Sequence, residues 1–356
     1  MVEKSPVPCC AGRGERGNGV MKKQVRIKFT NGLSFESGVR EILNVVLSEY
    51  EFIESERPDF VIFGPYGSDI PKGAFTRIGY FCENMKPDMT VCDWAFGTRY
   101  ENEVDDPRYS RIQWHGLDPN SLIKNQTNID EVVQRKSRFC NFVYSNPLAF
   151  REKFCAALSK YKPVDAPGKS MNNMASIEST NGHQGDMWQR KRAFISQYKF
   201  TIAFENSSYP GYHTEKIFDP MMVNSVPIYW GNPHIDRHFN TRSFVNAHEH
   251  LRANGSRLVE FLDANCQREF SDARPGTSNV VSTTVRRKLK GVGQGLKTRL
   301  QYESDFGELI EKIIEIDRDN DLYARYLSEP WFHGNTPPSN ESVVQRWRQI
   351  FGRLAA

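Results

Sequence analysis

The sequence predicts an α/β protein that contains two parallel sheets. Residues 198–231 consist of a short apolar run, a polar loop, a segment with apolar residues at helical spacing and a second apolar run. The same strand–helix–strand order recurs near the N-terminus, where apolar runs at 25–29 and 60–64 flank an amphipathic segment at 38–50. Such units build parallel sheets, and a chain of 356 residues is long enough for two domains of this kind.

The central unit has the features of a ligand-binding edge. Thr214 is a suitable N-cap for its helix, with Glu215 and Lys216 in the first turn. Ligands of open α/β sheets bind beyond the carboxyl ends of the strands, where the free N–H groups of a helix and a lysine suit a phosphate. Asn206, Tyr212 and Glu215 are polar groups suited to a ribose or a sugar. The same pattern is also typical of a capped surface helix behind a polar loop.

In the N-terminal part of the chain, a strand predicted over 77–84 brings Glu83 to the start of a loop. A carboxylate at a strand end that faces a cleft can accept a proton from a substrate hydroxyl. A capping or salt-bridging role is the alternative for a glutamate at this position.

The second sheet is predicted to begin with a strand at 139–144, and a helix over 149–161 follows. Arg151 lies near the start of this helix. Its planar guanidinium can bind two phosphate oxygens while it stays charged. The alternative is an ordinary arginine on the surface of the helix. A further amphipathic helix is predicted over 306–316.

Two segments have a strongly basic pattern. Residues 251–300 contain ten Lys or Arg against four Asp or Glu, and their Gly and Pro content predicts a solvated loop or a partly disordered insertion. A patch for anionic lipid, glycan or nucleic acid is the functional alternative. Residues 342–356 place apolar side chains on one face of a helix, with arginines beside them. This fits a helix on an anionic membrane surface or one that packs across the N-terminal domain, and we expect packing.

Several other classes of site have no support in the sequence. The seven cysteines include no CxxC pair, so neither a zinc knuckle nor a disulfide framework is indicated. Asp105-Asp106, the alternating aspartates at 317–321 and the histidines at 248–250 all lack the pattern of a metal site. The sequence contains no apolar run of about 18 residues, so no transmembrane helix is predicted. Its N-terminus also lacks the apolar core of a secretory signal. Residues 1–20 are predicted to be a disordered leader, with Met21 as an alternative start.

Two groups of motifs resemble a known family. FENSSYPGYHTEKIFD at 204–219, followed by PIYWG at 227–231, closely resembles the donor-binding signature of the α-1,3/1,4-fucosyltransferases, glycosyltransferase family 10. Glu83-Asn84 ahead of DWAFG at 93–97 resembles the motif of that family's N-terminal, acceptor-side domain. We expect the resemblance to cover roughly residues 60–250 and 302–333.

The resemblance implies a GT-B architecture, in which two Rossmann-like domains face each other across a cleft. Residues 21–140 are then expected to bind the acceptor and 141–325 to bind GDP-fucose, and 326–356 are expected to form a C-terminal segment with an amphipathic helix. It also implies an inverting transfer of L-fucose from GDP-fucose to the 3-OH or 4-OH of GlcNAc, in an acceptor such as N-acetyllactosamine.

The resemblance assigns a role to each candidate residue. Glu83 is expected to be the catalytic base, and Lys216 and Arg151 to bind the diphosphate. The residues expected to orient the ribose and fucose are Asn206, Tyr212 and Glu215. No cofactor or metal is expected to be required, because these cations and a helix terminus can hold the charge of the departing diphosphate; Mn or Mg is expected at most to stimulate.

Two other functions are consistent with the sequence. The first is an inverting transferase that uses another GDP-sugar, such as GDP-mannose. The second is a non-catalytic protein that binds polyanions or membranes through 251–300 and 342–356. No nucleic acid partner is expected. The missing apolar N-terminal segment predicts a cytoplasmic enzyme, peripheral at most on the inner membrane through 342–356.

Overall fold

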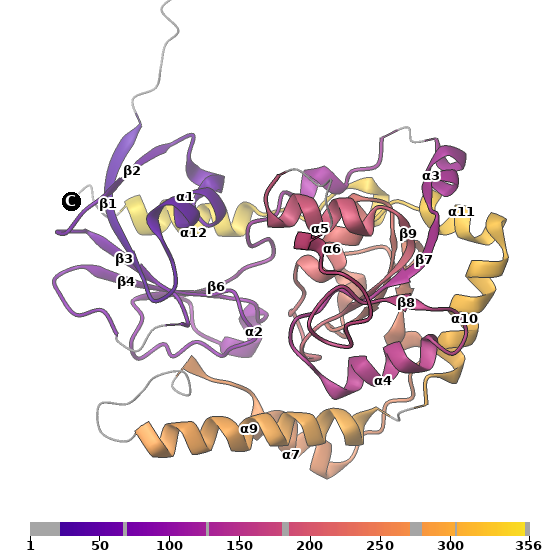
Figure 1. Ribbon diagram of the computed structural model, residues 1–356. Helices are drawn as coiled ribbons and strands as arrows, with labels where there is room; N and C mark the ends of the chain where they lie inside the picture. Colours follow the sequence, from indigo (N-terminus) through magenta and orange to yellow (C-terminus); the bar gives the residue numbers. More distant parts are fainter. Residues whose placement is uncertain are drawn as a thin grey trace, which may run out of the picture.

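The computed structural model describes residues 22–66, 70–125, 128–179, 185–270, 280–302 and 305–352, and of 280–284 only the backbone. The predicted leader and Met21 lie outside the described residues. Two domains stand side by side, each built on a parallel sheet (Figure 1). Among the described helices, none combines the length and the apolar character that a membrane span requires.

The first domain contains a six-stranded parallel sheet with the order β2-β1-β3-β4-β5-β6. All positions of β3 and the last four of β4 are buried, as expected for parallel strands that are covered on both faces. Its strands and helices are β1 (Lys23–Thr30), α1 (Phe35–Glu41), β2 (Tyr50–Glu54), β3 (Phe60–Phe63), β4 (Thr76–Phe81), β5 (Trp94–Gly97), α2 (Glu101–Val104) and β6 (Tyr109–Arg111).

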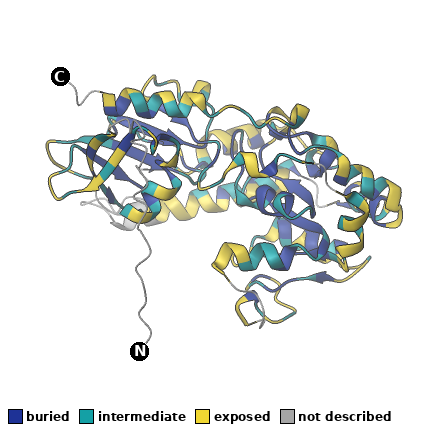
Figure 2. Ribbon diagram, turned by 90° about the horizontal axis from the view of Figure 1, so that it is seen from above, coloured by how far each residue is buried: buried dark blue, intermediate teal, exposed yellow. Residues whose placement is uncertain are grey.

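The second domain contains a five-stranded parallel sheet with the order β11-β10-β9-β7-β8. Its core joins these strands to the helices α4, α10 and α11, and Figure 2 shows most of the strand residues of this domain as buried. The elements are α3 (Ile129–Arg135), β7 (Arg138–Asn141), α4 (Ala149–Leu158), β8 (Val164–Asp165), α5 (Met187–Ile195), β9 (Tyr198–Phe204), α6 (Glu215–Met222), β10 (Val226–Trp230), β11 (Val245–Asn246), α10 (Gly307–Arg318) and α11 (Asn320–Ser328). The predicted α/β fold with two parallel sheets is confirmed.

The central strand–helix–strand unit forms as the sequence predicts. β9 and β10 pair in parallel along their length, and both are almost entirely buried. The Thr214 hydroxyl caps α6 by accepting a hydrogen bond from the N–H of Lys216. The apolar residues Ile217, Phe218 and Met221 of α6 are buried against the sheet. The N-terminus of α6 therefore has a fixed position beside the carboxyl end of β9.

The helix predicted over 38–50 is wrong in its limits. α1 is short, a 3-10 turn follows at Asn44–Val46, and Tyr50 already begins β2. Gly38 lies inside α1 and against Phe29, where a Cβ would collide with the aromatic ring. The apolar residues of 38–50 therefore belong to three elements, which are a helix, a turn and a strand. They match a helical period because all three elements face one core.

Most of the described residues of 251–300 belong to a helical hairpin rather than to the predicted loop, and residues 271–279 of the predicted insertion lie outside the described residues. Its helices, α7 (Arg257–Cys266) and α9 (Val280–Gln301), pack against each other along the lower side of the molecule in Figure 1. Gly293 of α9 faces Cys266, and a Cβ at this glycine would collide with the sulfur. Lys297 forms an ion pair with Asp263 of α7. A glycine that suggested a loop therefore lets two helices approach closely.

The hairpin is attached to both domains. Next to α7, the ring of Phe270 packs on Phe81 of the first domain with centroids 4.9 Å apart. The N–H of Lys86 donates to the carbonyl of Arg268 at 2.9 Å. At the other end, Tyr302 is buried in the core of the second domain. The hairpin therefore connects the two domains on one side.

The C-terminal helix α12 (Glu341–Gly352) returns to the first domain (Figure 1). Trp347 stacks on Phe96 with ring centroids 4.2 Å apart, and Phe351 is fully buried in the same core. The predicted packing across the N-terminal domain is confirmed. The alternative for 342–356, a helix on a membrane surface, needs the same apolar face, and over Glu341–Gly352 the first sheet covers that face.

The two domains also contact each other through a cluster of rings and arginines. The Arg111 guanidinium lies 4.6 Å from the ring centroid of Tyr100 and donates to the carbonyl of Gly211 at 3.0 Å. The Tyr100 ring stacks on His238 at 6.2 Å between centroids. Burial, together with the nearby Arg111 and Arg237, lowers the pKa of His238 to about 3.

We expect acid to destabilise the protein partly through His238. The unfolded chain binds a proton at this residue near pH 6.5, whereas the folded protein does so only near pH 3. The contribution of neutral His238 to the free energy of unfolding is therefore fully present above the pKa of the unfolded chain. It is lost as the pH falls towards the pKa of the folded protein. At pH 5 the loss is about 2 kcal/mol. Thermal unfolding of the parent and of His238→Phe at pH 7 and pH 5 measures it, and an equal loss in both proteins would contradict the assignment.

Candidate active site

A cavity of about 380 Å³ lies between the two domains. In the first domain, residues beyond the carboxyl ends of β1, β3, β4, β5 and β6 line it. In the second domain, the lining comes from Trp188 of α5, from the polar loop that follows β9 and from the N-terminal turn of α6. Five of the six predicted site residues line this cavity: Glu83, Asn206, Tyr212, Glu215 and Lys216.

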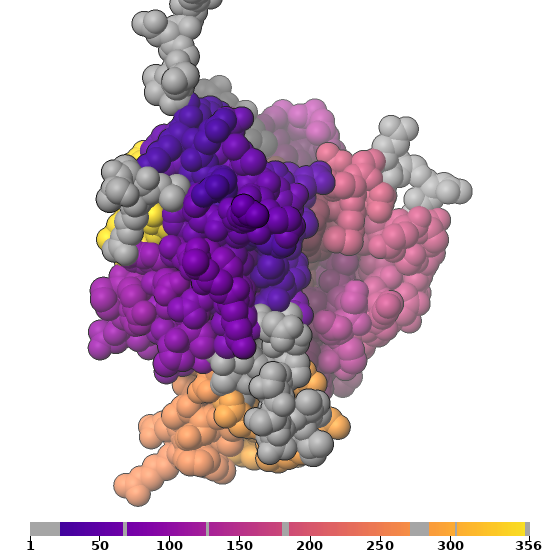
Figure 3. All heavy atoms as spheres, turned by 90° about the vertical axis from the view of Figure 1, so that its left-hand side faces the viewer, coloured from indigo at the N-terminus to yellow at the C-terminus, as the bar shows by residue number. Residues whose placement is uncertain are grey.

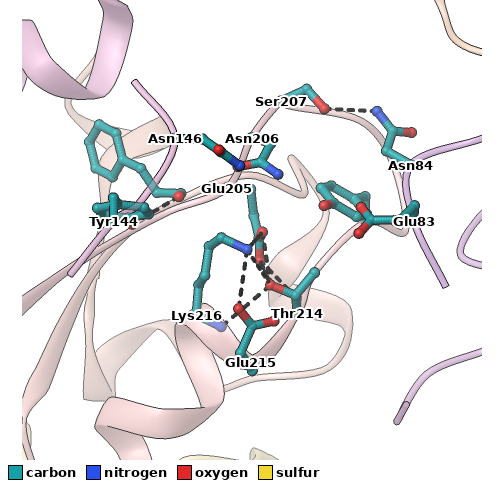
Figure 4. Close-up of polar contacts among 12 residues, drawn as sticks. Glu83, Asn84, Tyr144, Asn146, Glu205, Asn206, Ser207, Thr214, Glu215 and Lys216 are labelled. Carbon is teal, nitrogen blue, oxygen red and sulfur yellow. Dashed lines mark hydrogen bonds and ion pairs between the residues drawn. The ribbon is translucent and has the colours of Figure 1, made fainter. Parts of the chain in front are cut away.

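A buried carboxylate holds the start of α6 in place. Glu205 is almost completely buried, and its Oε1 accepts a hydrogen bond from the N–H of Thr214 at 2.8 Å. The Thr214 hydroxyl lies 3.0 and 2.9 Å from the two carboxylate oxygens, and the Lys216 Nζ lies 3.3 Å from Oε2 (Figure 4). Glu205 therefore fixes both the cap of α6 and its first lysine.

Lys216 is a cation held between two carboxylates. Its Nζ lies 3.3 Å from Glu205 Oε2 and 3.3 Å from Glu215 Oε1. Burial alone lowers the pKa of Lys216, but Glu205 and Glu215 outweigh burial and hold it above the ordinary lysine value. For Glu215, burial raises the pKa, yet Lys216 and Lys191 bring it below the ordinary value. The cavity therefore contains a fixed positive charge next to the N–H groups that begin α6.

Arg151 lies behind the cavity lining rather than in it. It is buried in α4, its Nη1 donates to Asn206 Oδ1 at 3.1 Å, and its Nη2 donates to the carbonyl of Asn146. Its guanidinium lies 3.8 Å from the ring centroid of Tyr144. Its Nε has no hydrogen-bond partner among the described residues. In this structure Arg151 therefore contacts Asn206, which lines the cavity, and does not line the cavity itself.

Tyr212 is a buried part of the cavity wall. Burial and the neighbouring carboxylates, Glu205 first among them, raise the pKa of its phenol well above the ordinary value. The hydroxyl therefore stays protonated and can donate a hydrogen bond.

Glu83 lies on the opposite side of the cavity. It follows β4 in the first domain and faces the group around Lys216 (Figure 4). The Tyr66 hydroxyl donates to its Oε1 at 2.6 Å, and Tyr66 lines the same cavity. This hydrogen bond orients the carboxylate and leaves its second oxygen for another partner. A capping glutamate would accept a hydrogen bond from a backbone N–H at the start of a helix. The side-chain hydrogen bond that the described residues give Glu83 comes instead from the Tyr66 hydroxyl.

Asn84 connects the Glu83 loop to the rest of the site. Its Nδ2 donates to the hydroxyl of Ser207 at 2.8 Å, and its Oδ1 accepts from Gln267 Nε2 at 3.1 Å. Ser207 belongs to the polar loop after β9, and Gln267 follows α7 in the hairpin. One side chain next to Glu83 therefore links the first domain, the second domain and the hairpin.

The sequence did not predict that five residues support the site: Tyr66, Asn84, Glu205, Ser207 and Gln267. Glu205 has a usable signal, because a carboxylate between a buried strand and a capped helix can reach the helix N–H groups. The other four depend on contacts between distant segments, such as the 183 residues that separate Asn84 from Gln267.

The described residues include no group of three or more His, Cys, Asp or Glu side chains arranged to hold a metal ion. The Nε2 of His248 instead forms a hydrogen bond with the backbone of Gly231, and the imidazole ring stacks on Trp230. Cys82, Cys92, Cys140, Cys155 and Cys266 are free thiols.

The fold and the site define a class of protein. Two parallel-sheet domains face each other across a cavity, with a helix N-terminus and a lysine on one side and a carboxylate on the other. This is the GT-B arrangement, and such a site suits an anionic leaving group and the removal of a proton.

Comparison with known proteins identifies the family. Residues 133–269 match "Glycosyltransferase family 10 (fucosyltransferase) C-term", and residues 27–117 match "Alpha-(1,3)-fucosyltransferase FucT N-terminal domain". The chain is 41% identical to the alpha-(1,3)-fucosyltransferase FucT of Helicobacter pylori over 233 residues, which are 55% of this chain and 46% of that protein. The chain belongs to glycosyltransferase family 10, the fucosyltransferases.

Other relatives are more distant. Alpha-(1,3)-fucosyltransferase B of Drosophila melanogaster is 36% identical over 118 residues, 32% of this chain and 26% of that protein. The chain thus spans less than half the length of these two curated relatives. Crystal structures of an alpha1,3-fucosyltransferase with GDP and with GDP-fucose each superpose with a TM-score of 0.60 at 21% identity. They cover 96% and 95% of this chain, and 94% and 93% of those chains, and show that the fold is shared.

Proposed function

We propose that the chain transfers L-fucose from GDP-fucose to the 3-OH or 4-OH of GlcNAc in a glycan acceptor, with inversion at the anomeric carbon. The observation that carries this proposal is one cavity that places Glu83 opposite the N-terminus of α6 and Lys216. Membership of the fucosyltransferase family supports the donor, and the names of the relatives support the α-1,3 linkage.

The proposed reaction is a single displacement. Glu83 takes the proton of the acceptor hydroxyl, and the oxygen forms a bond to the anomeric carbon of fucose from the side opposite GDP. The bond between that carbon and the phosphate oxygen breaks, and GDP leaves with the electron pair. Tyr66 holds Glu83 through one carboxylate oxygen, so the other oxygen is available to the acceptor.

The departing diphosphate needs positive charge. Lys216 and the N–H groups at the start of α6 meet that need at fixed positions, so no reorganisation is required when the charge develops. We also propose that Arg151 contributes from behind Asn206, and that Tyr212 and Glu215, which line the same cavity, orient the ribose and the sugar. These cations are sufficient for the chemistry, and we propose that Mn or Mg is not required.

The choice of donor has a direct test. Thermal unfolding is measured with GDP, GDP-fucose and GDP-mannose at equal concentrations. We expect GDP and GDP-fucose to raise the melting temperature, and GDP-mannose to raise it no more than GDP does. A larger shift with GDP-mannose than with GDP-fucose would favour an inverting transferase for another GDP-sugar. No shift with any of the three nucleotides would contradict the donor site.

We expect Asn84→Ala to lower kcat/KM by up to roughly 30-fold, because two neutral hydrogen bonds are lost at about 1 kcal/mol each and about 1.4 kcal/mol corresponds to a factor of ten. These bonds hold the Glu83 loop against Ser207 and Gln267. Steady-state kinetics with both substrates measures the effect. Asn265→Ala is the matched control, since among the described residues its side chain donates to Phe261 O within α7 and not to the Glu83 loop. Equal kinetics for the parent and the two variants would contradict this role of Asn84.

A further inference from the structure

The helix α9 presents an apolar stripe to solvent. The stripe consists of Val285, Leu289, Val292, Leu296 and Leu300, whose spacings of three and four residues place them on one helical face. Their side chains are between 36% and 69% exposed. Five exposed apolar residues in a row along one face of a helix are unusual on the surface of a soluble protein, and such patches mark interaction sites.

Among the described residues, the packing of the hairpin leaves the stripe exposed. α9 turns a different face towards α7, the one that carries Gly293 and the buried Lys297. The hairpin stands out from the lower side of the molecule (Figure 3). From Val285 to Leu300 the stripe is roughly 22 Å long, at about 1.5 Å per residue. It is therefore a surface of useful length on a projecting element.

The charge of α9 has a single sign. Its sequence contains six Lys or Arg and no Asp or Glu. Lys288 and Arg299 are exposed and border the stripe on one side, and Arg286 borders it on the other, with Glu269 at 4.0 Å. An apolar face between cations is the pattern of a helix that lies in the interface of an anionic bilayer.

We propose that the α9 stripe docks this protein on an anionic lipid surface. The apolar side chains would enter the boundary between headgroups and acyl chains, while Lys288 and Arg299 contact the phosphates. A second copy of the chain fits less well, because two stripes face to face would bring cations together without any acidic residue of α9 to match them. The C-terminal helix cannot serve instead, since its apolar face is packed on the first sheet. This inference does not depend on the proposed reaction.

The test is co-sedimentation of the full chain with vesicles. One set contains equal parts of phosphatidylcholine and phosphatidylglycerol, and the other contains phosphatidylcholine alone. We expect binding to the anionic set only, and weaker binding at high salt because the Debye length shortens. Equal binding to both sets, or binding to neither, would overturn the proposal.

Variants localise the surface. We expect Leu289→Ser/Val292→Ser/Leu296→Ser to bind the anionic vesicles roughly tenfold more weakly or worse, and Lys288→Glu/Arg299→Glu to do the same. The matched control is Ile53→Ser/Met171→Ser/Met187→Ser, which removes apolar residues of similar exposure elsewhere and should bind normally. Melting temperatures show whether each variant is folded. If the triple variant is destabilised, the binding of the charge variant decides the test. Unchanged binding of the charge variant, or a dimer that the triple variant dissociates, would overturn the proposal.

Discussion

Lys216→Met is expected to abolish nearly all fucose transfer, by roughly 10²- to 10³-fold in kcat, and to weaken GDP binding by roughly tenfold or more. The lysine is a cation at the N-terminus of α6, and its pKa is held above the ordinary value by Glu205 and Glu215. Its loss removes the fixed charge that meets the diphosphate. Steady-state kinetics and titration calorimetry with GDP measure the two effects.

A second variant separates binding from folding. Lys216→Met leaves Glu205 buried without its cation, which is expected to cost stability. Glu205→Gln/Lys216→Met removes both charges and should recover part of the melting temperature, because a neutral amide can still bond Thr214. Transfer and GDP binding should stay low in the double variant. Recovery of GDP binding together with stability would mean that Lys216 is structural and does not contact the donor.

Glu83→Gln is expected to lower kcat by roughly 10²- to 10⁴-fold and to leave GDP affinity within about twofold. Glutamine keeps an oxygen for the Tyr66 hydroxyl but cannot accept the acceptor proton. Glu83 also lies in the first domain, opposite the groups assigned to GDP. Transfer kinetics and GDP calorimetry measured on the same preparation give the two values.

Glu41→Gln is the matched control, because Glu41 is a carboxylate of the first domain that lines the same cavity. Its exposed partner is Arg40, so the change should cost little stability. Near-normal turnover of Glu83→Gln, or an equal loss in Glu41→Gln, would show that Glu83 is not the base.

Much of the donor side could be predicted because its signals are local. The strand, the Thr214 cap and the first turn of α6 follow one another within a few residues, so periodicity and capping rules locate them. The position of Arg151 in the sequence indicated a phosphate ligand, yet the fold buries it behind Asn206. A single sequence does not determine how deep a helix residue lies below a surface loop.

The errors of the sequence analysis have a common cause. At 38–50 the apolar residues of a helix, a turn and a strand coincide with a helical period, because all of them face one core. In the hairpin, Gly293 looked like a loop residue because only the packing against Cys266 explains it. The Asn84 network likewise joins segments whose proximity depends on the tertiary fold. Contacts between distant segments are the part that local patterns do not encode.

The most direct test of the proposed reaction is fucose transfer from GDP-fucose to N-acetyllactosamine, with lacto-N-biose in parallel and EDTA present or absent. We predict a fucosylated N-acetyllactosamine product that forms equally well in EDTA, with an α-1,3 link and an inverted anomeric configuration by NMR. Transfer with retention of configuration, or transfer lost in EDTA and restored by Mn or Mg, would contradict the roles given to Glu83 and Lys216. Neither transfer to these acceptors nor binding of GDP would contradict the donor site itself.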